Sequence, residues 1–282
     1  METKVIGTDL STPEWKWFPG PEALPKAGGS TPRMGLGFLV RSVRFPLASV
    51  VSKGKYTVWL HLPGEERDLF LCSAYIPVYN RDKAPALKEI WEGYREYSKK
   101  GLAVIGGDLN ARCGANGDHG VNSAGRQLMK GCKDEAASIV NLVPGRCTGE
   151  FSREQEVTLK NGDKVTHKTT IDYILMPEDQ LHRVRHMWLL DKGGLDSDHK
   201  PLKISLRWCH SALIRRQAPP RSFSTKWRLR EMTELDWDRY EDKCDEYMAL
   251  WVANFRVRRT DQLHPCFGRS GCPCFALLPL RW

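Results

Sequence analysis

The sequence predicts an α+β fold, in which helices pack on a mixed or antiparallel sheet. Short β-rich runs bounded by turn residues predict several strands. Two longer stretches, 84–100 and 124–139, carry apolar residues at helical spacing. The pair Asn161-Gly162 between the β-rich segments 156–159 and 164–166 is typical of a tight hairpin. Hairpins mixed with helices argue against a doubly wound parallel sheet.

The elements follow one another in this order. Strands are predicted at 37–40, 56–60 and 69–75. In the helix at 84–100, apolar residues recur every three or four positions and Gly101 ends the run. The apolar run from 102 leads to Asp108, and a turn-rich loop occupies 114–122. A second helix at 124–139, a strand at 140–143 and a final alternating strand at 203–208 complete the prediction.

Composition limits the class of protein. The chain has 282 residues, 41% of them hydrophobic and 10 of them Trp, which predicts a sizeable core. The net charge of +9 favours a polyanionic partner, nucleic acid first and an anionic membrane second, although a basic soluble protein with neither partner fits as well. No apolar run approaches the roughly 20 residues of a membrane-spanning helix. The 9 Cys residues form no regular framework, so we expect reduced thiols and a nuclear or cytoplasmic protein.

The ends of the chain differ from its middle. Residues 1–33 hold many Pro, Gly and Trp residues and are predicted to form a loop of the kind found between elements. After Trp208 the sequence predicts a second region, 209–282. It consists of a basic linker, an amphipathic helix at about 234–252 and a tail to which no fold is assigned.

Three stretches carry the candidate chemistry. The segment 194–202 places Asp196, Asp198 and His199 in a loop directly before a strand. The run that ends in Asp108 and Asn110 would put both side chains on one face if the chain stayed extended. Asp172 lies within the apolar run 170–175, so its carboxylate needs a partner there, and a histidine would serve.

Four motifs together resemble those of the endonuclease/exonuclease/phosphatase superfamily. They are Ala74-Tyr75-Ile76-Pro77, Gly107-Asp108-Leu109-Asn110, Ile171-Asp172-Tyr173-Ile174-Leu175 and Ser197-Asp198-His199, in the order of the superfamily. Within it, residues 1–208 look most like the endonuclease domain of LINE-type (non-LTR) retrotransposons. The resemblance implies a four-layer α/β-sandwich of the DNase I kind, with two mixed or antiparallel sheets packed face to face and flanked by helices.

The resemblance also implies roles for individual residues. Met1-Glu2-Thr3-Lys4 fits the motif that carries a metal-binding carboxylate, so Glu2, with Asp108 and Asp198, would bind Mg²⁺ or Mn²⁺. Asp108 would activate the attacking water and Asn110 would steady the site. His199 would contact the scissile phosphate, Asp172 would orient its ring, and Tyr75 would donate to a phosphate oxygen. The strands that precede this motif in the family would be missing.

The expected function is therefore a metal-dependent endonuclease that nicks DNA and primes reverse transcription, with a reverse transcriptase following in the full-length element. A truncated remnant that binds nucleic acid without cutting it is one alternative. A lipid or inositol phosphatase of the same superfamily is another. Thr169 and Thr170 precede Asp172 where AP endonucleases carry an aromatic residue, which favours intact DNA over abasic sites.

Overall fold

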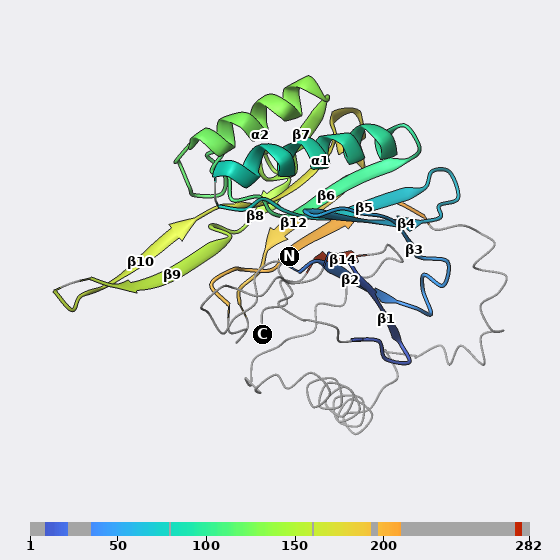
Figure 1. Ribbon diagram of the computed structural model, residues 1–282, viewed down its shortest axis with the longest axis horizontal. Helices are drawn as coiled ribbons and strands as arrows, with labels where there is room; N and C mark the ends of the chain where they lie inside the picture. Colours follow the sequence, from blue (N-terminus) through green and yellow to red (C-terminus); the bar gives the residue numbers. More distant parts are fainter. Residues whose placement is uncertain are drawn as a thin grey trace, which may run out of the picture.

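Two β-sheets packed face to face form the centre of the molecule, and two α-helices cover the outer face of the larger sheet (Figure 1). This computed structural model describes residues 9–21, 35–78, 80–159, 161–192, 197–209 and 274–277. The described residues form three of the four predicted layers: the helices, the larger sheet and the second sheet.

The larger sheet has six strands in the order β3-β4-β5-β6-β11-β7. Their bounds are Ser49–Lys53 (β3), Thr57–Leu62 (β4), Leu69–Tyr75 (β5), Leu102–Asp108 (β6), Asp172–Pro177 (β11) and Ala137–Ile139 (β7). β5 and β6 are parallel, and the other neighbours are antiparallel. A parallel pair needs a long crossover connection, which the helix between β5 and β6 provides. The mixed sheet agrees with the sequence prediction.

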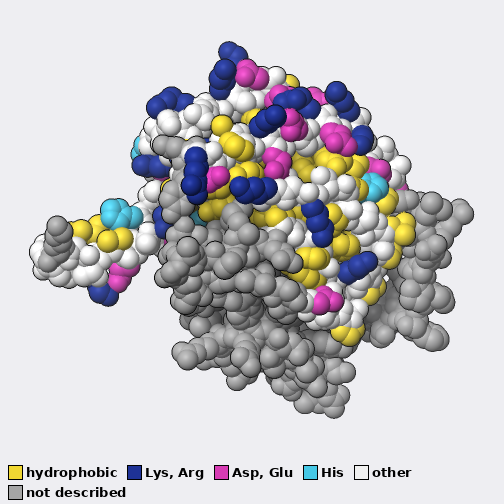
Figure 2. Space-filling view, viewed as in Figure 1, with side chains coloured by type: hydrophobic (Ala, Val, Ile, Leu, Met, Phe, Trp, Pro, Cys, Tyr) yellow, Lys and Arg dark blue, Asp and Glu magenta, His cyan; other side chains and the backbone are white. Residues whose placement is uncertain are grey.

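The second sheet has the order β14-β13-β12-β8. Its strands are Cys274–Leu277 (β14), Leu202–Leu206 (β13), Val184–Leu189 (β12) and Cys147–Thr148 (β8). Two further pairs of strands stand apart, Trp15–Pro19 (β1) with Gly37–Arg41 (β2), and Arg153–Thr158 (β9) with Lys164–Thr169 (β10). Figures 1 and 2 show the β9–β10 hairpin projecting from the body of the molecule.

The core lies on both sides of the larger sheet. One cluster of buried side chains, which includes Trp59 and Ile105, packs under the helices. The other cluster, which includes Leu71, Val104 and Ile174, fills the space between the two sheets. The central strands are therefore apolar at almost every position instead of alternating, because both of their faces are buried.

The helices begin and end differently from the prediction. α1 spans Asn80–Ser98 and starts four residues early, with Pro85 inside it as its sixth residue, beyond the first turn where proline is usually tolerated. α2 spans Ser123–Asp134 and begins at Asn122, whose side chain accepts a hydrogen bond from Gly125 N. The predicted helix to 139 is wrong, because Ala136 takes a φ of +48° and the chain continues as β7.

Several other boundaries also need correction. The predicted strand at 140–143 is instead a 3₁₀ turn, η1, Val140–Leu142, and a second turn, η2, spans Glu178–Arg183. β1 lies within the region predicted as a loop, and β3 and β12 were not predicted. β14 pairs with β13 although no fold was assigned to the tail. The linker and the helix predicted at about 234–252 lie outside the described residues.

Two general observations complete the fold. No helix in the described part of the chain is long and apolar enough to cross a membrane. Five cysteines within that part are free thiols: Cys72, Cys113, Cys132, Cys147 and Cys209. On the face shown in Figure 2, Lys and Arg side chains are interspersed with Asp and Glu over the helices.

Candidate active site

Three of the predicted site residues form one row across neighbouring strands. Tyr75 pairs with Asp108 across the parallel strands β5 and β6, and Asp108 pairs with Asp172 across the antiparallel strands β6 and β11. Because β11 runs in the opposite direction, its first residue meets the last residues of β5 and β6. Paired residues project from the same face of a sheet. Tyr75 packs against the core between the sheets, so the row faces the second sheet.

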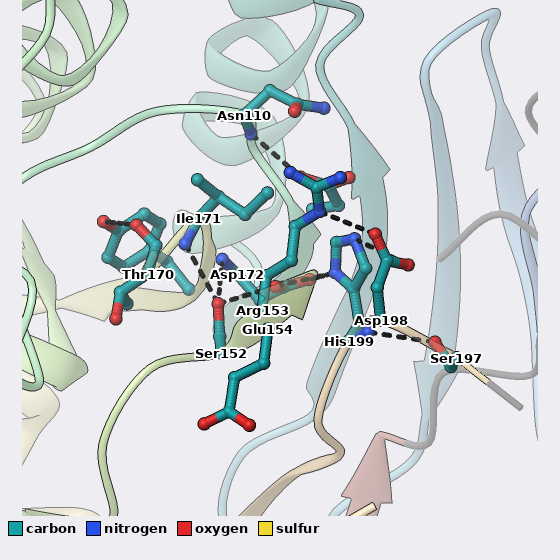
Figure 3. A network of polar contacts seen from close by, with 12 residues as sticks. Asn110, Ser152, Arg153, Glu154, Thr170, Ile171, Asp172, Ser197, Asp198 and His199 are labelled. Carbon is teal, nitrogen blue, oxygen red and sulfur yellow. Dashed lines mark hydrogen bonds and ion pairs between the residues drawn. The ribbon is translucent and has the colours of Figure 1, made fainter. Parts of the chain in front are cut away.

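His199 completes a buried pair with Asp172. Its Nδ1 lies 2.9 Å from Asp172 Oδ2 and 3.0 Å from Oδ1, and the two residues are only 5% and 4% exposed. The predicted partnership of these residues is therefore present. An imidazole held by a carboxylate on one nitrogen has a fixed orientation, and its second nitrogen is directed elsewhere. Here Nε2 faces Asp198 Oδ1 at 4.0 Å (Figure 3).

Ser152 holds Asp172 from the other side. Its hydroxyl donates to Asp172 Oδ2 at 2.7 Å and accepts from the backbone N–H groups of Ile171 and Asp172, each at 3.0 Å. The serine is completely buried. One hydroxyl thus fixes both the carboxylate and the first residues of β11, and a chain of bonds runs from Ser152 through Asp172 to His199.

Backbone hydrogen bonds join the start of β9 to the loop that carries His199. Glu154 N donates to Asp198 O, and Lys200 N donates to Ser152 O, both at 2.7 Å. Arg153 and His199 form an isolated antiparallel bridge between these two backbone bonds. Within this segment Ser152 contacts Asp172, Arg153 contacts Asp198, and Glu154 pairs with Lys200 at 2.9 Å. Figure 3 shows Arg153 and Glu154 pointing in opposite directions.

Arg153 binds the remaining predicted acid of the site. Its Nε donates to Asp198 Oδ2 at 2.7 Å, and its Nη2 donates to Gln155 Oε1 at 2.7 Å. The side chains of Arg153 and Asp198 are 30% and 17% exposed, so the pair lies at the edge of the site. A charge-assisted bond of this length orders Asp198 beside His199.

The negative charges around His199 set its protonation. Burial alone would lower the pKa of the imidazole, but Asp172, and to a smaller extent Asp108 and Asp198, raise that pKa above its ordinary value. The site therefore favours a positively charged imidazolium. A buried imidazole whose pKa is raised by specific carboxylate neighbours is a feature of many functional sites.

Asn110 does not lie beside Asp108 as an extended chain would place it. β6 ends at Asp108, and Asn110 has a φ of +45°, which turns the backbone. Its backbone N–H donates to Asp108 Oδ1 at 3.0 Å, while its side chain donates to Ile76 O at 2.8 Å. The expectation that both side chains share a strand face is wrong. Asn110 instead connects Asp108 to the segment that follows Tyr75.

The described residues include two of the three carboxylates expected to bind a cation. Asp108 and Asp198 offer carboxylate oxygens, the donors that Mg²⁺ and Mn²⁺ prefer, so their chemistry fits a hard divalent ion. Within the described residues, however, no three His, Cys, Asp or Glu side chains converge to hold a metal. Glu2, the third ligand implied by the resemblance, lies outside the described residues.

The sequence did not identify three residues that the structure places at the site. Arg153 is the first residue of the short polar strand β9 and Ser152 directly precedes it, and the pattern there gave no reason to single them out. Asn141 is buried in η1, where its side chain donates to Asp172 O and accepts from Ile174 N, at 3.2 and 3.1 Å. The Asn141 side chain therefore bonds the backbone of β11 as a neighbouring strand would, beyond the point where β7 ends. A polar residue within the apolar run 139–142 was the available signal.

Solved structures of similar fold include nucleases. The chain is similar to the endonuclease domain of TRAS1, a telomere-specific non-LTR retrotransposon, with 18% identity and a TM-score of 0.50, over 70% of this chain and 81% of that one. This likeness confirms the predicted fold. A scan against protein-family models and a search of curated proteins found no match.

Two further solved structures have TM-scores just below 0.5. The 3′ phosphatase NExo from Neisseria, bound to product DNA hairpin, is 15% identical over 69% of this chain and 80% of that one, with a TM-score of 0.49. The catalytic domain of Xenopus laevis APE2 is 13% identical over 72% of this chain and 78% of that one, also with a TM-score of 0.49.

Proposed function

We propose that the chain is a metal-dependent phosphodiester hydrolase that nicks DNA, of the kind that serves retrotransposition. The buried pair of Asp172 and His199, next to the row that joins Tyr75 and Asp108, is the observation that carries this proposal. A positive imidazolium, two carboxylates and a phenol at one end of the space between the sheets match the needs of phosphodiester hydrolysis.

Each residue has a distinct task in the proposed reaction. Asp172 accepts a hydrogen bond from His199 Nδ1, which directs Nε2 towards a phosphate oxygen. Asp108 takes a proton from the water that attacks phosphorus. The bond between phosphorus and the 3′ oxygen breaks, and that oxygen takes up a proton, which leaves the 3′-hydroxyl from which a reverse transcriptase can extend. Tyr75 donates to another phosphate oxygen.

A divalent cation, when bound, would neutralise charge on the phosphate and stabilise the leaving oxygen. We propose Mg²⁺ as this cation, with Mn²⁺ as a substitute, held by Asp108, Asp198 and Glu2. Asn110 supports the arrangement from outside, because its backbone holds Asp108 Oδ1 at 3.0 Å.

Charge supports DNA as the substrate. The chain has a net charge of +9, and a protein that neutralises phosphates with Lys and Arg releases counterions, so binding should weaken with salt. The free thiols of the described cysteines suit the nucleus or cytoplasm, where such an enzyme would act.

The direct test is nicking of supercoiled plasmid in Mg²⁺ and in Mn²⁺, by the wild type and by His199→Ala. We expect nicks that require the cation and disappear in the variant. His186→Ala is a matched control, because His186 lies on β12 and contacts Thr148 at 3.1 Å, away from the row. Binding of the plasmid with no cation-dependent nicking would contradict the proposal, and so would phosphate release from inositol lipids in place of nicking.

A further inference from the structure

Arg153 forms an ion pair with Asp198, the carboxylate that the proposed function assigns to the cation. Arg153 Nε lies 2.7 Å from Asp198 Oδ2, the separation of a charge-assisted hydrogen bond. The other oxygen, Oδ1, faces His199 Nε2 at 4.0 Å. Asp198 Oδ2 is therefore bound by a guanidinium, and Oδ1 lies near an imidazole nitrogen.

The position of Arg153 is fixed by more than this one bond. Its backbone is paired with that of His199, and its Nη2 donates to Gln155 Oε1 at 2.7 Å. The guanidinium is thus kept at the mouth of the site by its own strand. It reaches Asp198 through a single nitrogen instead of the two-point contact that Arg makes in its strongest pairs, and it is 30% exposed. A contact of this kind can be replaced by a contact between Asp198 and another cation.

We propose that Arg153 competes with the divalent cation for Asp198, and so sets the cation concentration that the enzyme requires. A guanidinium and a divalent ion that share one carboxylate lie close enough to repel each other strongly. Binding of the ion must therefore displace Arg153 from Asp198 Oδ2. This inference rests on the proposed function, because that function assigns the cation to Asp198. It adds a residue, Arg153, that opposes cation binding until it is displaced.

Direct titration of the protein with Mn²⁺ alone, followed by calorimetry and by the paramagnetic signal of free Mn²⁺, tests the competition without an activity assay. Arg153→Gln should bind Mn²⁺ at least about tenfold more tightly than the wild type, because one positive charge next to the ligand is removed. Arg95→Gln is the matched control. Arg95 makes an equivalent Nε contact of 2.9 Å with Glu135, outside the site, and should leave the affinity unchanged.

A double variant shows whether the gain passes through Asp198. Asp198→Asn should abolish the increase that Arg153→Gln produces. Gln155→Leu is the second variant, for use if Arg153→Gln does not fold. It removes the other anchor of the guanidinium from an exposed position and should tighten Mn²⁺ binding by about twofold to threefold.

The outcomes separate this inference from the proposed function. Tighter Mn²⁺ binding in Arg153→Gln supports the competition even if no variant nicks DNA, and in that case only the function fails. Unchanged or weaker binding overturns the competition even if the wild type nicks DNA, and weaker binding would mean that Arg153 prepares Asp198 for the ion. Absence of Mn²⁺ binding in both proteins likewise overturns it.

Discussion

Asp108 and Asp172 lie directly opposite each other across strands β6 and β11. Two carboxylates in this position repel, so the pair costs stability unless positive charge lies close by. His199 supplies part of that charge through its contact with Asp172 at 2.9 Å. An unfavourable cross-strand pair that is compensated by a buried histidine indicates a functional site more strongly than either acid alone.

The Asp172–His199 pair predicts the effect of a neutral substitution. Asp172→Asn retains the shape of the side chain but removes the charge that orients the ring and favours the imidazolium. We expect the single-turnover nicking rate to fall by roughly 10²- to 10⁴-fold. Asp163→Asn serves as the control, because Asp163 is exposed near the tip of the β9–β10 hairpin and bonds only locally to Asn161. A rate close to that of the wild type for Asp172→Asn would exclude Asp172 from catalysis.

Removal of the Ser152 hydroxyl should reduce both stability and activity. Ser152→Ala leaves two buried N–H groups and one carboxylate oxygen without their shared partner. The free energy of unfolding should fall by about 1–3 kcal/mol, measured by denaturant titration. The nicking rate should fall as well, because Asp172 loses its support. Ser123→Ala, at an exposed position at the start of α2, should change stability by less than about 0.5 kcal/mol.

The absence of a side chain at Gly107 allows β5 and β6 to lie close together. A Cβ at this position would collide with the carbonyl oxygen of Ala74 on the neighbouring strand. Gly107→Ala should lower the free energy of unfolding by an amount near the upper end of about 1–3 kcal/mol. It should also impair nicking, because the pairing of Tyr75 with Asp108 lies one residue further along. Gly145→Ala meets no atom within 4 Å and should cost only about 1 kcal/mol for its positive φ. Equal costs for the two variants would contradict this account.

The lowered pKa of Asp118 determines how this residue contributes to stability in acid. Burial would raise the pKa of its carboxyl, but hydrogen bonds from Arg112 and from the N–H groups of Thr170 and Gly120 hold that pKa below the ordinary value of 3.8. The native state therefore binds the proton less readily than the unfolded chain does. The stability that Asp118 contributes is complete above its ordinary pKa and is lost as the pH falls through the lowered value.

The measurement for Asp118 compares acid unfolding of the wild type and of Asp118→Asn. The variant should be less stable at neutral pH, and the difference between the two proteins should shrink as the pH falls below 3.8. A difference that stays constant through that range would show that Asp118 acts through its shape instead of its charge.

The sequence predicted the central strands and the main pair of the site for identifiable physical reasons. Strands buried on both faces are continuously apolar, so an acid among them, such as Asp172, is conspicuous and requires a partner. The segment around Ser152 and Arg153 is polar throughout, so no contrast with apolar neighbours marks these two residues. The end of α2 depends on the positive φ of Ala136, a residue type that favours helices, so no local pattern could reveal it.

The order of strands in the larger sheet governs when the active site can form. β7 is made before β11, yet the strand that pairs with β7 in the described sheet is β11, which inserts between β6 and β7. During synthesis β7 can pair within the sheet only after residues 172–177 have been made. These residues form β11, which also brings Asp172 to Asp108. Closure of the sheet and assembly of the site are thus a single late folding event, dominated by contacts distant in sequence. A nascent chain that stops before β11 has an incomplete larger sheet and lacks both Asp172 and His199.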